Sequence, residues 1–525
     1  MQRDEELAVP SHVTMIVTYS RDVNLDPAES VGLANVVGVG DHDDVSTSLA
    51  DSPVRAPEAS PRWEGVRVTV MGLGTRAGGV GVARYLAEQG AVVTVTDLRP
   101  ADELGDSLAQ LDGLEVRAVL GRHDEADFTL PGAEVVVRNP GVRRDNRLLE
   151  LARRSGVRVE MEMTLFLAAC PAPVIGITGT KGKTSTTALL GEMLRAWRPD
   201  AVVAGNMGIS ALGQLHGIGP DTPVTLELSS WQLEAMDEWR LAPHIAVLTN
   251  IYPDHLDTYR DFDDYAETKR SIARHLTPDD RLVAWADHEP VRPAVESTAA
   301  RYFGFGLGDR PTDGVWIHGD SLVIRDEGGC STVALPGTRW LTGPYQRLNA
   351  AAATAAAHLS GAPVDAILAG LESFTGVENR AELVATIGGV EFVNDTAATA
   401  PAAAIASIQG HGGRRVHLIA GGADKRLPLD ELGRVIAMHA ATVTLLDGTA
   451  TPALGDAIER HGGHIAAMVG SMAEAVERAD AAASDGDVIL LAPGCASFGM
   501  FRDEFDRGQR FRDAVSLLAN RETPS

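Results

Sequence analysis

A glycine turn containing two lysines lies between residues 179 and 184, where the sequence reads Gly-Thr-Lys-Gly-Lys-Thr. It directly follows the apolar run VIGIT and opens a segment with a helical pattern. Such a turn aims several backbone N–H groups and a helix N-terminus at one point, which suits a polyphosphate. We expect Lys183 to reach the β- and γ-phosphates and the Thr184 hydroxyl to ligate Mg²⁺.

Three further polar groups lie at or just beyond the ends of apolar strands in the same region. Glu227 ends the run TPVTLE, and Asp254 and His255 follow IAVLTN; Lys269 comes fourteen residues later. A carboxylate at the end of a strand beside a phosphate loop can hold magnesium. A single acid or histidine of this kind is more often merely solvated. Together they favour a metal–nucleotide site.

An earlier glycine cluster, residues 72–78, only loosely follows the GxGxxG pattern. With Asp97 at the end of the next strand, it is compatible with a dinucleotide fold. It is equally compatible with a UDP-sugar site, because such a site also binds phosphate groups at a glycine turn before a helix. No feature is dedicated to nicotinamide or flavin chemistry.

Two polar residues also follow strands late in the chain: Lys425 in LIAGGADKRLP and Ser497 in LLAPGCASFGMF. Either is compatible with ordinary loop polarity. If both face the phosphate loop across a cleft, a cation and a hydroxyl would suit a small carboxylate.

Alternation of short Val/Ile strands with helices predicts parallel sheets covered by helices on both faces, an α/β fold. We expect three domains: a Rossmann-like domain over 63–171, a central P-loop domain with a parallel-rich sheet over 172–373 and a second Rossmann-like domain over 374–525. Residues 1–62 are acidic and without periodicity, which predicts a disordered extension to which we assign no function.

Composition narrows the class of protein further. The 525 residues carry a net charge of −26, which argues against nucleic acid or an anionic membrane as the main partner. Three separated cysteines fit a reduced cytoplasm, and no apolar run is long enough to span a membrane. Only four of the 46 basic residues are lysines. Either codon bias left these four by accident, or they do what arginine cannot; the surroundings of Lys183, Lys269 and Lys425 favour the second interpretation, and Lys181 has no assigned role.

Taken together, the motifs over about residues 63–520 resemble the Mur ligase family of peptidoglycan synthesis, which serves cell-wall biogenesis, cell shape and division. The closest resemblance is to members that add glutamate to UDP-N-acetylmuramoyl-L-alanine. It implies an ATP-dependent, ADP-forming amide ligase that works through an acyl phosphate in the cytoplasm as a monomer. It implies a UDP-binding first domain, an ATP-binding central domain and a glutamate-binding third domain. D-Glutamate is the first choice of acceptor and L-glutamate the alternative.

The resemblance also implies roles for individual residues. The UDP moiety would lie on Thr75, Arg76, Asp97 and Arg99, with Asn139 to Gly141 forming a neighbouring turn. ATP would contact Gly179, Thr180, Lys181, Gly182, Lys183, Thr184, Ser185, Asn349, Arg380 and Asp395. The muramoyl-alanine arm would contact Asn206, Ser229 and Gln232, and glutamate would contact Lys425 and Ser497.

For catalysis, the resemblance implies two Mg²⁺ ions, with Thr184, Glu227, His255 and Lys269 as the metal site and Lys183 on the phosphates. Lys269 matches a lysine that carries a carbamate in this family. Carbamylation turns a cation into a carboxylate-like group, which arginine cannot supply.

Several positions depart from the family's usual pattern. They are Lys181 in the phosphate loop, Tyr345 and Gln346 in GPYQRLN, Ala397 and Ala400 in NDTAATAP, and Glu504 in FRDEFDRG. Alternative classes are a folylpolyglutamate-synthase-like ligase, a P-loop switch ATPase and a catalytically inactive binding protein. The glycine turn of the first domain suits a UDP-sugar and so disfavours a folylpolyglutamate-synthase-like ligase. A P-loop switch ATPase would not need His255, Lys269 or a third α/β domain, so these features disfavour that class.

Overall fold

The structure is a computed structural model that describes residues 63–75, 77–255, 258–341 and 343–522. The predicted acidic extension, residues 1–62, and the predicted UDP contact Arg76 lie outside the described residues.

The first sheet has five parallel strands in the order β3-β2-β1-β4-β5. Valines that alternate along β1, β2 and β4 bury themselves against the neighbouring helices. The register pairs Met71 with Arg138, so the glycine turn after β1 lies beside the Asn139 turn after β4. This part contains β1 (Arg67–Met71), α1 (Ala77–Glu88), β2 (Val92–Asp97), α2 (Gly105–Ala109), β3 (Val116–Leu120), β4 (Val135–Arg138), α3 (Arg147–Arg154), β5 (Arg158–Glu160) and α4 (Glu162–Ala169).

The central sheet has nine strands in the order β14-β13-β12-β11-β10-β9-β6-β8-β7. Its strands and helices are β6 (Val174–Thr178), α5 (Lys183–Trp197), β7 (Val202–Gly205), β8 (Val224–Glu227), α6 (Ser230–Glu238), β9 (Ile245–Leu248), α7 (Phe262–Arg270), β10 (Arg281–Trp285), α8 (Arg292–Ser297), β11 (Arg301–Leu307), β12 (Gly314–His318), β13 (Ser321–Asp326), β14 (Gly329–Ala334), α9 (Pro344–Leu359) and α10 (Val364–Ser373). Strands β6 to β12 are parallel, whereas β13 and β14 add an antiparallel edge.

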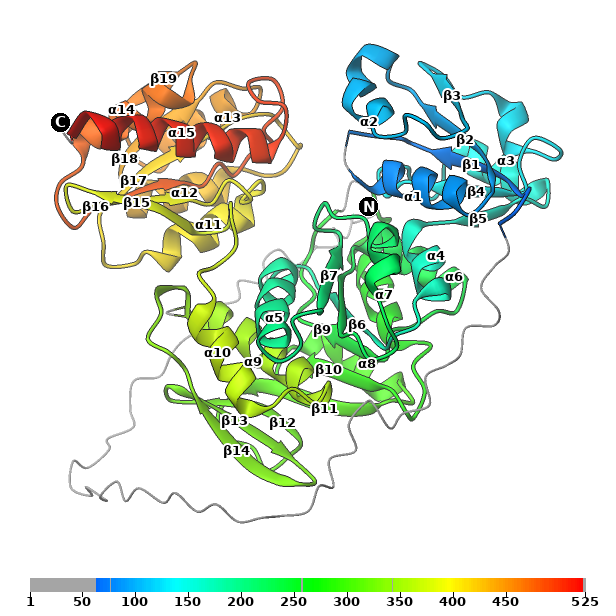
Figure 1. Ribbon diagram of the computed structural model, residues 1–525. Coiled ribbons are helices and arrows are strands. Elements are labelled where there is room, and N and C mark those ends of the chain that lie inside the picture. Colours follow the sequence, from blue (N-terminus) through cyan, green and yellow to red (C-terminus); the bar gives the residue numbers. More distant parts are fainter. Residues whose placement is uncertain (1–62, 76, 256–257, 342, 523–525) are drawn as a thin grey trace, which may run out of the picture. The chain divides into compact units, whose positions relative to one another are not determined.

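Helices α5, α9 and α10 cover one face of the central sheet (Figure 1). The alanine-rich sequence of α9 buries residues 350–353 and 355–357, and their small side chains let the helix approach the sheet closely. A glycine allows a similar approach where α10 crosses α5, because a Cβ on Gly370 would lie 2.6 Å from the Met193 backbone.

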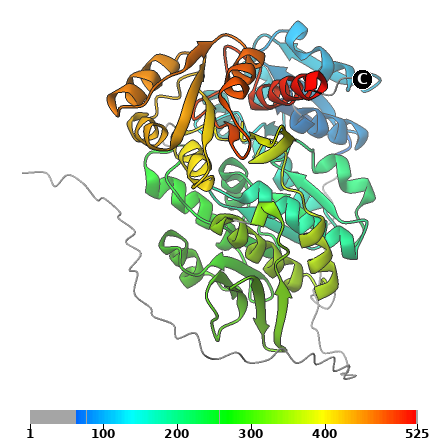
Figure 2. The same cartoon turned by 90° about the vertical axis from the view of Figure 1, so that its left-hand side faces the viewer.

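The third sheet has six strands in the order β15-β16-β20-β17-β18-β19, and only β15 is antiparallel. Helix α15 lies against the sheet beside β15 and β16 (Figures 1 and 2). Its residues Phe511 and Val515 are buried in the core of this part. This part contains β15 (Glu382–Ile387), β16 (Val390–Asn394), α11 (Pro401–Gly410), β17 (Val416–Ala420), α12 (Asp430–His439), β18 (Ala440–Leu446), α13 (Thr451–Arg460), β19 (Ala467–Val469), α14 (Met472–Ala482), β20 (Val488–Leu491) and α15 (Glu504–Glu522).

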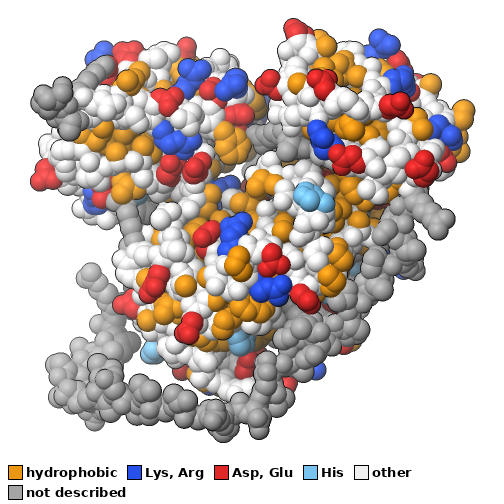
Figure 3. All heavy atoms as spheres, in the orientation of Figure 1, with side chains coloured by type: hydrophobic (Ala, Val, Ile, Leu, Met, Phe, Trp, Pro, Cys, Tyr) orange, Lys and Arg blue, Asp and Glu red, His pale blue; other side chains and the backbone are white. Residues whose placement is uncertain are grey.

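The predicted α/β class with three domains and parallel-rich sheets is confirmed, although the antiparallel strands β13, β14 and β15 were not foreseen. The boundaries at residues 171 and 373 stay predictions. Within the described residues, no helix is long and apolar enough to cross a membrane. Basic and acidic side chains intermingle over the visible surface rather than forming a patch of one sign (Figure 3).

Candidate active site

The phosphate loop connects β6 to α5 and needs glycine at two positions. Gly179 and Gly182 have φ angles of 148° and 83°, which L-residues rarely adopt. A Cβ on Gly182 would also lie 2.3 Å from Oδ1 of Asn349. The predicted ATP contact Asn349, on α9, therefore does lie against the loop.

Two residues that follow β9 hold the loop from the adjacent strand. The backbone N–H of Lys181 donates to Oδ1 of Asn250 at 2.9 Å, and the Asn250 amide donates back to the Lys181 carbonyl at 2.9 Å. The Thr249 hydroxyl donates to the same carbonyl at 2.8 Å. The sequence analysis missed Thr249 and Asn250, although two polar residues directly after an apolar strand were a usable signal.

Lys183 is folded back over the loop that carries it. Its ammonium donates to the carbonyls of Gly179 at 3.0 Å and Thr180 at 3.2 Å. Burial lowers the pKa of Lys183, and the nearby Glu227 carboxylate opposes that shift. The loop thus presents a cation and backbone N–H groups at one helix N-terminus, which is the arrangement an anionic phosphate needs.

Glu227 ends β8 with its side chain buried at 2% exposure. Its Oε1 accepts a hydrogen bond from the Asn206 amide at 3.0 Å, whereas its Oε2 is buried without a hydrogen-bond partner. An unpartnered buried carboxylate oxygen is costly unless a cation compensates it. Glu227 therefore fits a metal ligand.

Lys269 on α7 is also buried, at 2% exposure, and its ammonium donates to the Thr178 hydroxyl at 3.1 Å. It lies 5.7 Å from the ring centre of Tyr265, whose hydroxyl is 3.2 Å from that of Thr180. Burial, with the neighbouring Lys183 cation, lowers the pKa of Lys269 well below its usual value. Tyr265 is a second residue that sequence reasoning missed.

His255 follows β9 and has a left-handed backbone with φ of 54°. Its ring is 5.0 Å from that of Trp231, edge to face. The neighbouring Asp254 forms an ion pair with Lys181 at 3.6 Å, which gives that lysine a partner in the loop. Among the described residues, no group of three His, Cys, Asp or Glu side chains could hold a metal.

In the first domain, two predicted contacts hold the glycine turn in place. The Asp97 carboxylate accepts from the backbone N–H of Gly74 and of Arg99, both at 2.9 Å. The Asn139 amide donates to the Gly72 carbonyl at 3.1 Å. Thr75 is exposed on this turn. The geometry gathers Thr75, Asp97, Arg99 and Asn139 at one sheet edge.

Ser229 and Gln232 form a capping box at the start of α6. The Ser229 backbone N–H donates to Oε1 of Gln232 at 2.8 Å, and the Gln232 N–H donates to the Ser229 hydroxyl at 3.4 Å. Both side chains are buried. The Ser229 hydroxyl and the Gln232 side-chain oxygen are therefore used within the helix cap, which sets the direction of α6 after Glu227.

In the third domain, the Lys425 ammonium donates to the Thr399 hydroxyl at 2.9 Å, and burial lowers the pKa of Lys425. Ser497 is buried near this loop region at 3% exposure. Burial raises the pKa of Asp395, which accepts from the Ala381 N–H at 3.2 Å. Arg380 is exposed next to that segment.

Models of known protein families match three parts of the chain, and all three describe Mur ligase domains. Residues 66–160 match the Mur ligase MurD-like N-terminal domain, 177–357 the Mur ligase middle domain and 379–495 the Mur ligase glutamate ligase domain. The three matches together span most of the described chain. The chain belongs to the Mur ligase family.

Two curated Mur ligases show how far the likeness extends. The chain is 47% identical over 471 residues to a protein of Roseiflexus sp. strain RS-1, covering 86% of this chain and 98% of that one. It is 37% identical over 459 residues to a protein of Symbiobacterium thermophilum, with the same coverage. Both relatives are named UDP-N-acetylmuramoylalanine–D-glutamate ligase.

Solved Mur ligase structures share the fold at lower identity. A UDP-N-acetylmuramate–alanine ligase from Thermotoga maritima matches with a TM-score of 0.56 at 19% identity, over 86% of this chain and 99% of that one. A pseudomurein peptide ligase from Methanothermus fervidus gives 0.52 at 18%, over 86% and 100%. These matches support the Mur ligase architecture.

For this Mur ligase, Arg507 is a further residue that sequence reasoning missed. Its side chain is fully buried on α15 and donates to the Thr396 hydroxyl and carbonyl at 2.9 and 3.0 Å and to the Cys495 carbonyl at 3.2 Å. It thus joins the loop after β16 to the loop that carries Ser497. One arginine among 42 gave no signal of this role in the sequence.

Proposed function

We propose that this Mur ligase joins D-glutamate to UDP-N-acetylmuramoyl-L-alanine at the expense of ATP, in the cytoplasm and as a monomer. The names and high identity of its relatives support the substrates. The observation that carries the chemistry is that a buried Glu227 oxygen without a hydrogen-bond partner and a buried Lys269 both lie beside the phosphate loop, close enough for Glu227 to influence the pKa of Lys269. Its proposed substrates, a UDP-nucleotide and ATP, support a cytoplasmic location.

In the first step, an oxygen of the alanyl carboxylate attacks the γ-phosphorus of ATP and the bond from that phosphorus to the β-γ bridging oxygen breaks. ADP leaves, and an acyl phosphate remains. Lys183 and the N–H groups at the start of α5 hold the phosphates in line, which lowers the barrier mainly by positioning and charge stabilisation. Two Mg²⁺ ions, held by Thr184, Glu227, His255 and Lys269, would neutralise charge on the transferring group.

Lys269 is suited to carbamylation because its lowered pKa favours the neutral amine. The amine nitrogen would attack the carbon of CO₂, and loss of a proton would leave an N-carboxylate anion. This modification would place a second anionic group near Glu227, where the described side chains alone supply too few acids for a metal site.

In the second step, the amine of glutamate attacks the acyl phosphate carbon, and a tetrahedral intermediate collapses to the amide and inorganic phosphate. Lys425 and Ser497 would bind the carboxylates of glutamate, with Thr399 orienting the Lys425 ammonium. A cation and hydroxyls match the two carboxylates of the acceptor.

A product assay tests the proposal. Purified protein with ATP, Mg²⁺ and UDP-N-acetylmuramoyl-L-alanine is incubated with D-glutamate or L-glutamate, and the nucleotide product is weighed by mass spectrometry. We expect one glutamyl unit to be added with the D-enantiomer only. A product formed only with L-glutamate would show that L-glutamate is the acceptor. No product with either enantiomer would overturn the proposal.

A further inference from the structure

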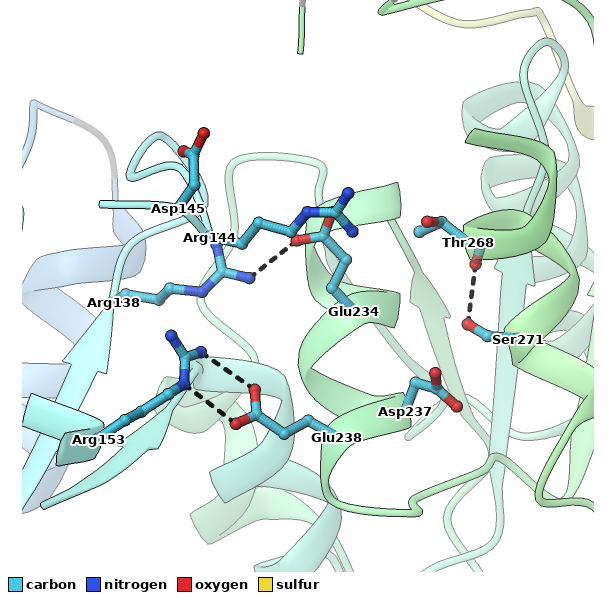
Figure 4. A pocket seen from close by; sticks show the side chains of 9 residues that line it. All are labelled: Arg138, Arg144, Asp145, Arg153, Glu234, Asp237, Glu238, Thr268 and Ser271. Carbon is cyan, nitrogen blue, oxygen red and sulfur yellow. Dashed lines mark hydrogen bonds and ion pairs between the residues drawn. The ribbon is translucent and has the colours of Figure 1, made fainter. Parts of the chain in front are cut away.

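Arg138, the last residue of β4, has its guanidinium buried at 3% side-chain exposure. It donates to the Val142 carbonyl at 2.8 Å within its own turn. Across to α6 it donates to the Trp231 carbonyl at 3.3 Å and to Oε2 of Glu234 at 3.2 Å. Figure 4 shows the guanidinium pointing toward Glu234. One side chain therefore spans two segments about 90 residues apart in sequence.

The two ends of this contact belong to predicted functional elements. On one side, Arg138 immediately precedes the turn Asn139–Gly141, which the Val142 N–H closes by donating to the Asn139 carbonyl at 2.9 Å. On the other, it holds the first turn of α6, where the Trp231 ring contacts that of His255.

Burial makes this contact specific. An arginine can satisfy three acceptors at once from a rigid planar fork, which neither lysine nor a neutral residue can do. Glu234 is buried as well, at 9% side-chain exposure. Removing Glu234 leaves the buried Arg138 cation without its ion-pair partner, and removing Arg138 leaves Glu234 with only the longer and more exposed ion pair to Arg144, at 3.6 Å.

We propose that Arg138 is a positioning residue that sets the Asn139 turn of the first domain against helix α6, and through Trp231 orients the His255 side of the active site. The inference rests on the proposed function in one respect, namely that the Asn139 turn contacts the UDP substrate.

A second ion pair in the same cleft provides a matched control. The cleft has a volume of about 390 Å³ and is lined by both pairs. Arg153 on α3 donates to Glu238 on α6 at 3.2 Å, but these side chains are 35% and 47% exposed. The two pairs lie side by side in Figure 4. Arg153 thus links similar elements without holding the Trp231 carbonyl.

The experiment measures binding of UDP-N-acetylmuramoyl-L-alanine by calorimetry without ATP or metal, in the full-length protein. The variants are Arg138→Met, Arg138→Met with Glu234→Gln, Arg138→Lys, and the control Arg153→Met. Hydrogen exchange at residues 229–233 is followed in each. The double variant leaves no unpaired buried charge, so it is the one most expected to stay folded.

We expect the single and double Arg138→Met variants to bind about tenfold more weakly, equivalent to ~1.4 kcal/mol, with faster exchange at 229–233. Arg138→Lys should recover part of the affinity, and Arg153→Met should stay within about twofold of wild type. A folded double variant with wild-type affinity and exchange would overturn the inference. An equal loss of affinity in Arg153→Met would overturn it too, because the effect would then not be specific to Arg138.

Failure of the proposed function gives a different result. If the wild-type protein itself does not bind the UDP substrate, the proposed substrate is wrong. The exchange measurement then still decides the inference: faster exchange at 229–233 in the Arg138 variants alone supports it, and unchanged exchange contradicts it.

Discussion

The ammonium of Lys269 lies 3.1 Å from the hydroxyl of Thr178, the last residue of β6 before the phosphate loop. Helix α7 therefore places a lysine at the base of the phosphate loop, where among the described residues it forms no ion pair. A buried cation without an ion-pair partner is unfavourable unless its charge is removed, and the Glu227 and Asp254 carboxylates oppose the lowering of the Lys269 pKa without reversing it. Carbamylation removes it and supplies an anion at the same place.

Replacing Lys269 tests whether an anion is needed there. We expect Lys269→Ala and Lys269→Arg each to lower kcat at least about a hundredfold, the usual scale for losing a group that stabilises the transition state. Short carboxylic acids should partly restore Lys269→Ala, which leaves space, but not Lys269→Arg. Substantial activity of Lys269→Arg in a phosphate-release assay would exclude the carbamate.

The lowered pKa of Lys269 also predicts how stability depends on pH. In CO₂-free buffer the folded protein binds fewer protons than the unfolded chain between the lowered pKa and the usual value of 10.5. Stability should therefore rise with pH through that window.

Thermal denaturation of Lys269→Met checks this sign. The variant should melt at a higher temperature than wild type near pH 7, and the difference should shrink as the pH approaches 10.5. A difference that stays constant with pH would contradict a shifted lysine.

Gly182 should tolerate no side chain for two separate reasons. Its φ of 83° strains alanine by about 1–2 kcal/mol, and the Cβ would also collide with the Asn349 amide. We expect Gly182→Ala to raise the KM for ATP at least about tenfold. The control Gly462→Ala has a φ of 80° with open space around it, so it should lose stability but keep the KM.

We expect Arg507 to affect the binding of glutamate. Arg507→Met leaves the carbonyls of Thr396 and Cys495 without their donor, at a cost of about 1–3 kcal/mol. Because these carbonyls belong to the loops near Ser497, the KM for glutamate should rise while the KM for ATP stays unchanged. Steady-state kinetics with each substrate varied would show an equal rise in both if Arg507 were only a general core residue.

Local patterns in the sequence were enough to predict the phosphate loop and the alanine-rich helix α9. A strand that ends in a glycine turn has few alternative structures, and unbroken alanine favours a helix. The polar residues after β9 were visible in the sequence, but the hydrogen bonds between Asn250 and Lys181 were not, because these residues are 69 positions apart and their pairing depends on strand order. The Arg138–Glu234 pair is 96 positions apart and was missed for the same reason.

The antiparallel strands escaped prediction for a different reason. Residues 314–334 form β12 to β14 through short connections; β12 is almost wholly buried, β13 alternates and β14 is mostly exposed. Nothing within so short a run separates a hairpin at a sheet edge from one more parallel strand. Of the four lysines, Lys181 and Lys183 lie in the phosphate loop and Lys269 contacts Thr178 just before it, whereas Lys425 contacts Thr399 in the third domain.

Isotope transfer tests the ligation mechanism most directly. UDP-N-acetylmuramoyl-L-alanine labelled with ¹⁸O in both alanyl carboxylate oxygens is converted with ATP and D-glutamate, and the released phosphate is analysed by mass spectrometry. Because the acyl phosphate passes one carboxylate oxygen to phosphorus, each phosphate formed with product should carry one ¹⁸O. Product accompanied by unlabelled phosphate would contradict the acyl phosphate, and with it the assigned function of this site.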